Sequence, residues 1–169
     1  NDVNKISPII KTIFKEYSLN RIIGLMNKIP VNNKNGTISK IILNEISNIY
    51  EKNPANKFIA IKMLEKFSNI RWPYLGVFNK FISDYNELAD NFSDIELSEI
   101  IYYMSKNNIN HFDIIENVLS NIKNFTRLND NDKFNLLLSL INLGMYKNSK
   151  IANEIIIQIL ENLDNNYTY

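Results

Sequence analysis

One helix-pair pattern recurs in this chain at a spacing of 37 residues, the distance from Leu97 to Phe134. Apolar residues at positions i, i+3, i+4 and i+7 mark one face of a first helix, and a second stripe follows after a short loop. Because both stripes recur together, we predict a tandem array of helix pairs. The first stripe is Leu97, Ile100, Ile101 and Met104, repeated as Phe134, Leu137, Leu138 and Ile141. The second stripe is Ile114, Ile115, Val118, Leu119 and Ile122, repeated as Ile151, Ala152, Ile155, Ile156 and Ile159.

Two earlier copies carry the same pattern, which argues against a chance match. The earliest copy is degenerate, because Glu45 stands where the next copy has Phe81. A leading helix precedes both. The stripes of the later copy are Ala60, Met63, Leu64 and Phe67, then Val77, Phe78, Phe81, Ile82 and Tyr85. The leading helix is expected to gather Ile9, Ile10, Ile13, Phe14 and Tyr17 on one face.

Prolines and polar caps are expected to mark the helix ends. Ser93 and Glu96 form a predicted capping box, in which each side chain bonds the other residue's backbone N–H. Ser7-Pro8, Asn53-Pro54 and Trp72-Pro73 are predicted to open helices, and Pro30 to stop one. The other predicted caps are Thr37, Asn110, Asn148, and either Asn129 or Asp130.

These patterns predict an all-α protein of about nine helices. A leading helix would occupy residues 1–17, a helical-repeat array residues 18–164 and a tail residues 165–169. No stretch alternates long enough to predict a strand. Because one helix pair cannot bury both of its stripes alone, successive pairs must stack side by side. The expected architecture is a right-handed α-solenoid of about four antiparallel helix pairs.

The composition lacks the residues of most common catalytic sites. The 169 residues include no cysteine, one histidine and four scattered glycines. These counts exclude a disulfide framework, a cysteine nucleophile and the usual zinc sets, and no glycine-rich phosphate loop is present. His111 stands near a predicted helix start, so we interpret it as a surface or capping residue rather than part of a Ser-His-Asp triad. We expect no enzymatic activity, no cofactor and no small-molecule substrate.

Two acidic pairs offer an alternative to that expectation. Glu96 with Glu99, and Asp130 with Asp132, could serve as general acid and base. Their position in the first turns of predicted helices favours another role, because negative charge there is stabilised by the helix dipole and the exposed amides.

The charge balance limits the classes of partner. With 19 basic and 18 acidic residues the formal charge is +1, so any binding to nucleic acid must be local. The longest apolar runs, such as Ile155-Ile156-Ile157, fall far short of the ~18 residues that cross a bilayer. We expect no membrane partner.

Basic, aromatic and amide side chains on the solvent side of the first helices form the candidate binding surface. In stacked helix pairs they would align as a ladder, where cations neutralise phosphates, tyrosines stack on unpaired bases and asparagines read base edges. Such lysines can equally form a solvated face, and Tyr102 or Tyr103 can pack against a neighbouring pair. The candidates are Arg21, Asn27, Lys28, Lys62, Lys66, Arg71, Tyr102, Tyr103, Lys106, Asn142 and Lys147.

The array resembles the heptatricopeptide repeats of apicomplexan organellar proteins, which are related to octotricopeptide repeats and to the helical region of FAST-kinase-like proteins. The resemblance rests on the 37-residue unit, on the helix start at residues 92–97 and on the inter-helix turn at residues 141–146. It covers roughly residues 18–163.

The resemblance implies RNA binding in mitochondria without catalysis. Members of the family are mitochondrial RNA-binding proteins, and many end in a nuclease-like RAP domain; the few residues after Leu163 are expected to be a tail. The implied partners are RNA, in particular ribosomal RNA fragments, and other ribosomal or RNA-processing proteins. We therefore expect a structural component of the mitochondrial ribosome or of organellar ribosomal RNA maturation. The alternative is a tetratricopeptide-like protein-interaction scaffold, which the near-neutral charge favours.

Overall fold

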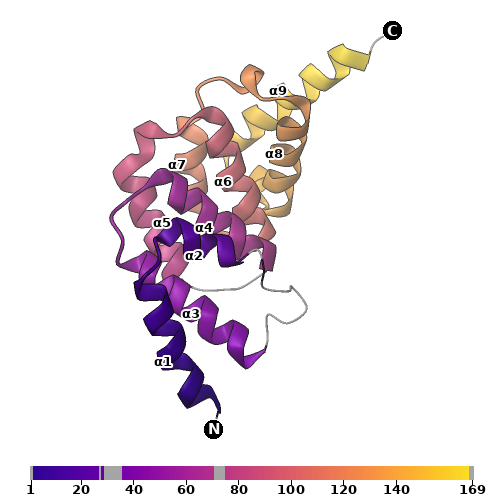
Figure 1. Ribbon diagram of the computed structural model, residues 1–169. Helices are drawn as coiled ribbons and strands as arrows, with labels where there is room; N and C mark the ends of the chain where they lie inside the picture. Colours follow the sequence, from indigo (N-terminus) through magenta and orange to yellow (C-terminus); the bar gives the residue numbers. More distant parts are fainter. Residues whose placement is uncertain (1, 27, 29–35, 71–74, 168–169) are drawn as a thin grey trace. The chain divides into compact units, whose positions relative to one another are not determined.

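The computed structural model describes residues 2–26, 28, 36–70 and 75–167 (Figure 1). Within these residues the protein has nine α-helices, a few short 3-10 turns and no strand, so the prediction of an all-α fold is confirmed. None of the helices in these ranges is long and apolar enough to cross a membrane. The chain divides into two compact units, residues 1–87 and 88–169.

The N-terminal unit holds five helices around one apolar core. They are α1 (Asp2–Lys15), α2 (Leu19–Met26), α3 (Thr37–Glu51), α4 (Lys57–Ile70) and α5 (Leu75–Leu88). Helix α1 packs against α3, and α2 packs against both α3 and α4 (Figure 1). The core consists of Phe14, Leu19, Ile22, Ile23, Leu43, Ile46, Tyr50, Met63, Phe67 and Val77.

The C-terminal unit contains two helix pairs. The first helices are α6 (Asp94–Lys106) and α8 (Asp130–Asn142), and the second helices are α7 (Phe112–Asn121) and α9 (Lys150–Tyr167). Short 3-10 turns lie at η2 (Ala89–Asn91), η3 (Phe125–Arg127) and η4 (Met145–Lys147). Helix α6 packs against α7 and α8, and α9 packs against α7 and α8. First helices therefore neighbour first helices, and second neighbour second.

Local hydrogen bonds define both ends of α6 and α8. Ser93 and Glu96 form the predicted capping box, and the Asn129 side chain accepts from the Asp132 N–H, so Asn129 rather than Asp130 is the cap. Each helix ends at a residue with positive φ, Asn108 after α6 and Gly144 after α8. Both the caps and the end residues stand 36 residues apart. First helices in this unit therefore step by 36 residues, not 37.

The one-residue difference changes which face of α8 is buried. The α6 stripe at Leu97, Ile100, Ile101 and Met104 is buried as predicted. In α8 the buried residues are Leu136, Leu137 and Leu140, whereas Phe134, Leu138 and Ile141 of the predicted stripe are exposed. That prediction is wrong except at Leu137, because the apolar residues of α8 spread over a wider arc than one stripe and the register follows the 36-residue spacing of the caps.

Several predicted helix starts are also wrong. Pro8 lies inside α1, where it forfeits one backbone bond within the first turns. Residues within three positions of the predicted caps take their place: α3 follows Gly36, Asn56 accepts from Ile59 N–H at α4, and Ser149 accepts from Ala152 N–H at α9. His111 precedes α7 without a side-chain cap bond. The predicted boundaries at Pro30 and at Trp72-Pro73 lie outside the described residues.

The expected apolar face of the leading helix is divided in two. Phe14 is buried in the core of the N-terminal unit, and Ile10 and Tyr17 pack partly against it. Ile9 and Ile13 are exposed. Five apolar residues in nine positions cover more of a helix than one contact with α3 can bury.

Candidate functional site

The candidates on α2 centre on a cation–aromatic pair. The Arg21 guanidinium carbon lies 4.3 Å from the centre of the Tyr17 ring. The short break between α1 and α2 brings them together, because Tyr17 ends the turn and Arg21 lies in the first turn of α2. Lys28 is exposed two residues after α2 ends. Asn27 lies outside the described residues.

The candidates on α4 share one carboxylate. Glu65 accepts hydrogen bonds from Lys62 Nζ at 2.9 Å and from Lys66 Nζ at 3.0 Å. Partial burial raises the pKa of Glu65, but the bonds from both lysines outweigh it and hold this pKa below its usual value. The three residues thus present a single net positive charge. Arg71 lies outside the described residues.

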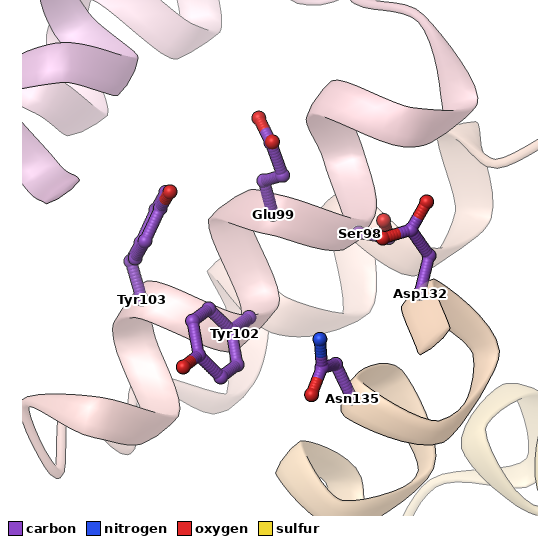
Figure 2. Close-up of a pocket in the computed structure, with 6 residues that line it drawn as sticks. All are labelled: Ser98, Glu99, Tyr102, Tyr103, Asp132 and Asn135. Atoms are coloured by element: carbon purple, nitrogen blue, oxygen red, sulfur yellow. The ribbon is translucent and has the colours of Figure 1, made fainter. Parts of the chain in front are cut away.

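The candidates on α6 form an aromatic pair. The rings of Tyr102 and Tyr103 are tilted with centroids 5.4 Å apart, and Lys106 Nζ lies 5.4 Å from the centre of the Tyr102 ring. Both tyrosines are half-buried. They line a small pocket to which α6 also contributes Ser98 and Glu99, and α8 contributes Asp132 and Asn135 (Figure 2).

This pocket is acidic, which the ladder prediction did not anticipate. Two carboxylates line it, Glu99 from α6 and Asp132 from α8 (Figure 2). Asp132 accepts from the Asn129 side chain at 2.7 Å and lies in the first turn of α8, so its predicted place in a first turn is confirmed. Glu99 lies beyond the first turn of α6, so that prediction is wrong for it. Two carboxylates beside two tyrosines suit a cationic group rather than a phosphate.

The remaining candidates lie at the end of α8. Asn142 is the last residue of that helix and is exposed. Lys147 follows in η4, where its Nζ lies 5.6 Å from the centre of the exposed Tyr146 ring. Tyr146 is therefore a neighbouring aromatic residue that sequence reasoning missed.

The two units carry opposite formal charges. Residues 1–87 contain 13 Lys and Arg against 7 Asp and Glu, whereas residues 88–169 contain 6 against 11. The formal charges are +6 and −5, which cancel in the whole-chain value of +1. Summing the formal charge separately over the two halves of the sequence reveals this difference, which the total charge conceals. The candidates on α2 and α4 belong to the basic unit, and those on α6, α8 and η4 to the acidic unit.

A buried polar cluster joins α3 and α5, and sequence reasoning missed it. Tyr50 Oη donates to Asp84 Oδ2 at 2.9 Å, Lys80 forms an ion pair with Asp84 Oδ1, and Lys80 Nζ lies 5.7 Å from the centre of the Tyr50 ring. Burial, then the charge of Asp84 and its hydrogen bond, raise the pKa of Tyr50 well above its usual range. Because all three groups satisfy one another, the cluster holds helices together rather than offering a reactive group.

No metal-ligand set was found in the described parts of the chain: none of their His, Asp and Glu side chains gather in threes. His111 is exposed at the start of α7. These residues place cations on α2 and α4, and an acidic aromatic pocket between α6 and α8.

A comparison with protein-family models, a search of curated proteins and a search of solved structures each found no match.

Proposed function

We propose that this protein is a helical-repeat RNA-binding protein without catalytic activity, whose helix pairs stack as a right-handed α-solenoid. The packing within each unit supports stacking: α2 lies against α4 and α6 against α8 among first helices, and α7 lies against α9 among second helices. Contacts between like helices of successive pairs are what a solenoid requires.

The concentration of positive charge in residues 1–87 carries the proposal. A surplus of six cations in a unit of this size attracts a polyanion even though the whole chain is nearly neutral. Arg21, Lys62 and Lys66 lie on α2 and α4, which pack against each other. Phosphates would be bound there by the cations, and the Tyr17 and Arg21 planes offer a stacking surface for an unpaired base.

The biological setting follows from the resemblance to organellar heptatricopeptide proteins. The proposed RNA is ribosomal, and the proposed place is the mitochondrial ribosome or the maturation of organellar ribosomal RNA, beside other ribosomal or RNA-processing proteins. In that setting the protein holds RNA and makes or breaks no covalent bond.

Salt dependence of RNA binding tests the proposal. Fluorescence anisotropy with a labelled single-stranded RNA at several salt concentrations should give an affinity that falls with a log–log slope of about −0.7 per phosphate neutralised. Changing Lys62 and Lys66 together to glutamine should weaken binding and make the slope shallower.

The matched control changes Lys123 and Lys150, exposed lysines of the acidic unit, to glutamine. This pair should leave RNA affinity nearly unchanged. Absent or salt-independent binding, or equal losses in both double variants, would contradict the proposal.

A protein-binding scaffold is the second candidate, favoured by the acidic pocket between α6 and α8. Glu99, Asp132, Tyr102 and Tyr103 suit the ammonium or guanidinium group of a partner's lysine or arginine. A lysine- and arginine-rich peptide should then bind, and Glu99→Gln with Asp132→Asn should abolish its binding without affecting RNA.

A further inference from the structure

Phe58 is an aromatic residue whose ring lies largely outside the packing of the N-terminal unit. It is the second residue of α4 and is 59% exposed. The apolar stripe of α4 does not include it, and that stripe is buried at Ala60, Met63, Leu64 and Phe67. An exposed phenylalanine presents a flat apolar ring to water, and a planar ligand that covers the ring removes this apolar surface from water. The residues around Phe58 indicate which ligand that is.

The face of α4 that carries Phe58 also carries the two lysines of the proposed RNA surface. Lys62 follows Phe58 by four residues and Lys66 follows Lys62 by four, so the three side chains lie along one face of the helix. The Lys62 side chain is 43% exposed. Glu65 lies on this face as well, where it accepts from both lysines at 2.9 and 3.0 Å. Two cations and one carboxylate leave this face with a net positive charge beside an exposed ring.

Helix α2, which packs against α4, adds to this positive charge. Its Arg21 is exposed and lies 4.3 Å from the centre of the Tyr17 ring. The sequence of α2 contains no acidic residue, so Glu65 is the only carboxylate that the two helices carry. Helices α2 and α4 therefore combine planar side chains with a surplus of cations.

An unpaired base of RNA is a planar ligand that brings its own negative charge. Proteins that bind single strands combine cations along the phosphate backbone with aromatic side chains on which bases stack. An apolar protein surface would also cover the Phe58 ring, but it would have to desolvate the neighbouring Lys62 ammonium without pairing it. The charge on this face therefore favours a nucleotide over an apolar partner.

We propose that Phe58 is a base-stacking residue: an unpaired base of single-stranded RNA lies on its ring, and Lys62 binds an adjoining phosphate. The proposal rests on RNA binding by the basic unit and adds a contact that phosphates alone do not provide. Every base has a π-face, so the contact accepts any base. It requires an unpaired base, because the faces of paired bases are covered within the duplex. Phe58 thus gives this surface a preference for single-stranded over double-stranded RNA.

Affinity and salt dependence, measured together, test this role. In fluorescence anisotropy with a labelled single-stranded RNA, Phe58→Leu should weaken binding at least about fivefold, because it removes the stacking ring. The log–log salt slope should stay unchanged, because no cation is lost. Phe58→Tyr keeps an aromatic ring and should bind like the wild type. The Lys62 and Lys66 double variant should instead give a shallower slope.

Inorganic polyphosphate, a polyanion without bases, should compete equally well against the wild type and Phe58→Leu. The matched control is Phe134→Leu, which removes a ring that is 51% exposed in the acidic unit and should leave RNA affinity unchanged. Circular dichroism should show both leucine variants folded. Unchanged RNA binding by Phe58→Leu, equal losses in both leucine variants, or an equal loss toward polyphosphate would overturn the stacking role. A shallower slope in the lysine variant would then still support RNA binding, whereas a wild type that binds no RNA would remove both proposals.

Discussion

Both units carry the sequence pattern of helix pairs, but the helices within each unit are held by different contacts. In the N-terminal unit a buried tyrosine and aspartate, with a half-buried lysine, join α3 to α5, and α3 follows Gly36 without a side-chain cap. In the C-terminal unit the buried residues of α6 and α8 are mostly aliphatic, and each of these helices begins with a side-chain cap. The apolar stripes are thus common to both units, while the polar contacts are particular to each.

The contrast extends to the formal charge of the two units, and it shows which positions of a helix-pair pattern can differ. Buried stripe positions must stay apolar for successive helices to pack, whereas exposed positions are free to change. The N-terminal unit has a surplus of basic residues and the C-terminal unit a surplus of acidic residues, which gives formal charges of +6 and −5. Units of opposite formal charge can therefore share one pattern of apolar helix packing.

Asp84→Ala is expected to have the largest effect, because it removes the centre of the polar cluster. Tyr50 Oη and the Lys80 ammonium would lose their shared acceptor in a buried site. The free energy of unfolding should fall by about 3–5 kcal/mol in denaturant titrations. Asp84→Asn keeps an acceptor for Tyr50 and should cost less, and the exposed Asp90→Ala serves as control. A loss no larger than that of the control would mean that both units are held by apolar packing alone.

Two neighbouring leucines in α8 test which of its apolar residues contribute to the core of the C-terminal unit. Leu137 is buried, so Leu137→Ala should cost about 2–5 kcal/mol of unfolding free energy through lost burial and the cavity left behind. Leu138 is 42% exposed, so Leu138→Ala should cost less than about 1 kcal/mol. Thermal or denaturant unfolding of the two variants measures which leucine is buried. A larger loss of stability in Leu138→Ala than in Leu137→Ala would support the stripe predicted from the 37-residue spacing.

Ser93→Ala sharpens the contrast in helix capping. The Ser93 hydroxyl accepts from Glu96 N–H, and Glu96 in turn accepts from Ser93 N–H at 2.8 Å. Removing the hydroxyl should cost about 1 kcal/mol in unfolding free energy. The matched change Gly36→Ala, at a start that has no side-chain cap, tests whether α3 depends on its first turn in the same way. Equal losses at both positions would remove this difference between the units.

Glu65→Gln should have the smallest effect on stability and a clear effect on charge. The pKa of Glu65 lies below its ordinary 4.5, so its ion pairs stabilise the folded state above that pH, and the contribution disappears as pH falls through the folded-state pKa. The variant should lose only about 0.2–1 kcal/mol near neutral pH, and the difference from wild type should vanish in acid. Because Lys62 and Lys66 would be released, RNA affinity should rise. Weaker RNA binding would indicate that Glu65 positions the lysines.

The sequence predicted the features that depend on residues close together in the chain. Helix content, the α6 and α7 stripes and the capping box at Ser93 all arise from contacts within about one helical turn. Of the candidate binding residues, it found Tyr102 and Tyr103 together but not Asp132 beside them, because Asp132 comes from a separate helix.

Tertiary structure alone decided which face of α8 is buried and how α3 meets α5. The apolar residues of α8 spread over a wide arc that fits a step of 36 or of 37 residues equally well, so periodicity could not choose between Leu136 and Phe134. Tyr50 and Asp84 stand 34 residues apart, and no local pattern pairs them. Burial and long-range hydrogen bonds depend on which surface arrives opposite a residue, and that is determined only when the helices pack.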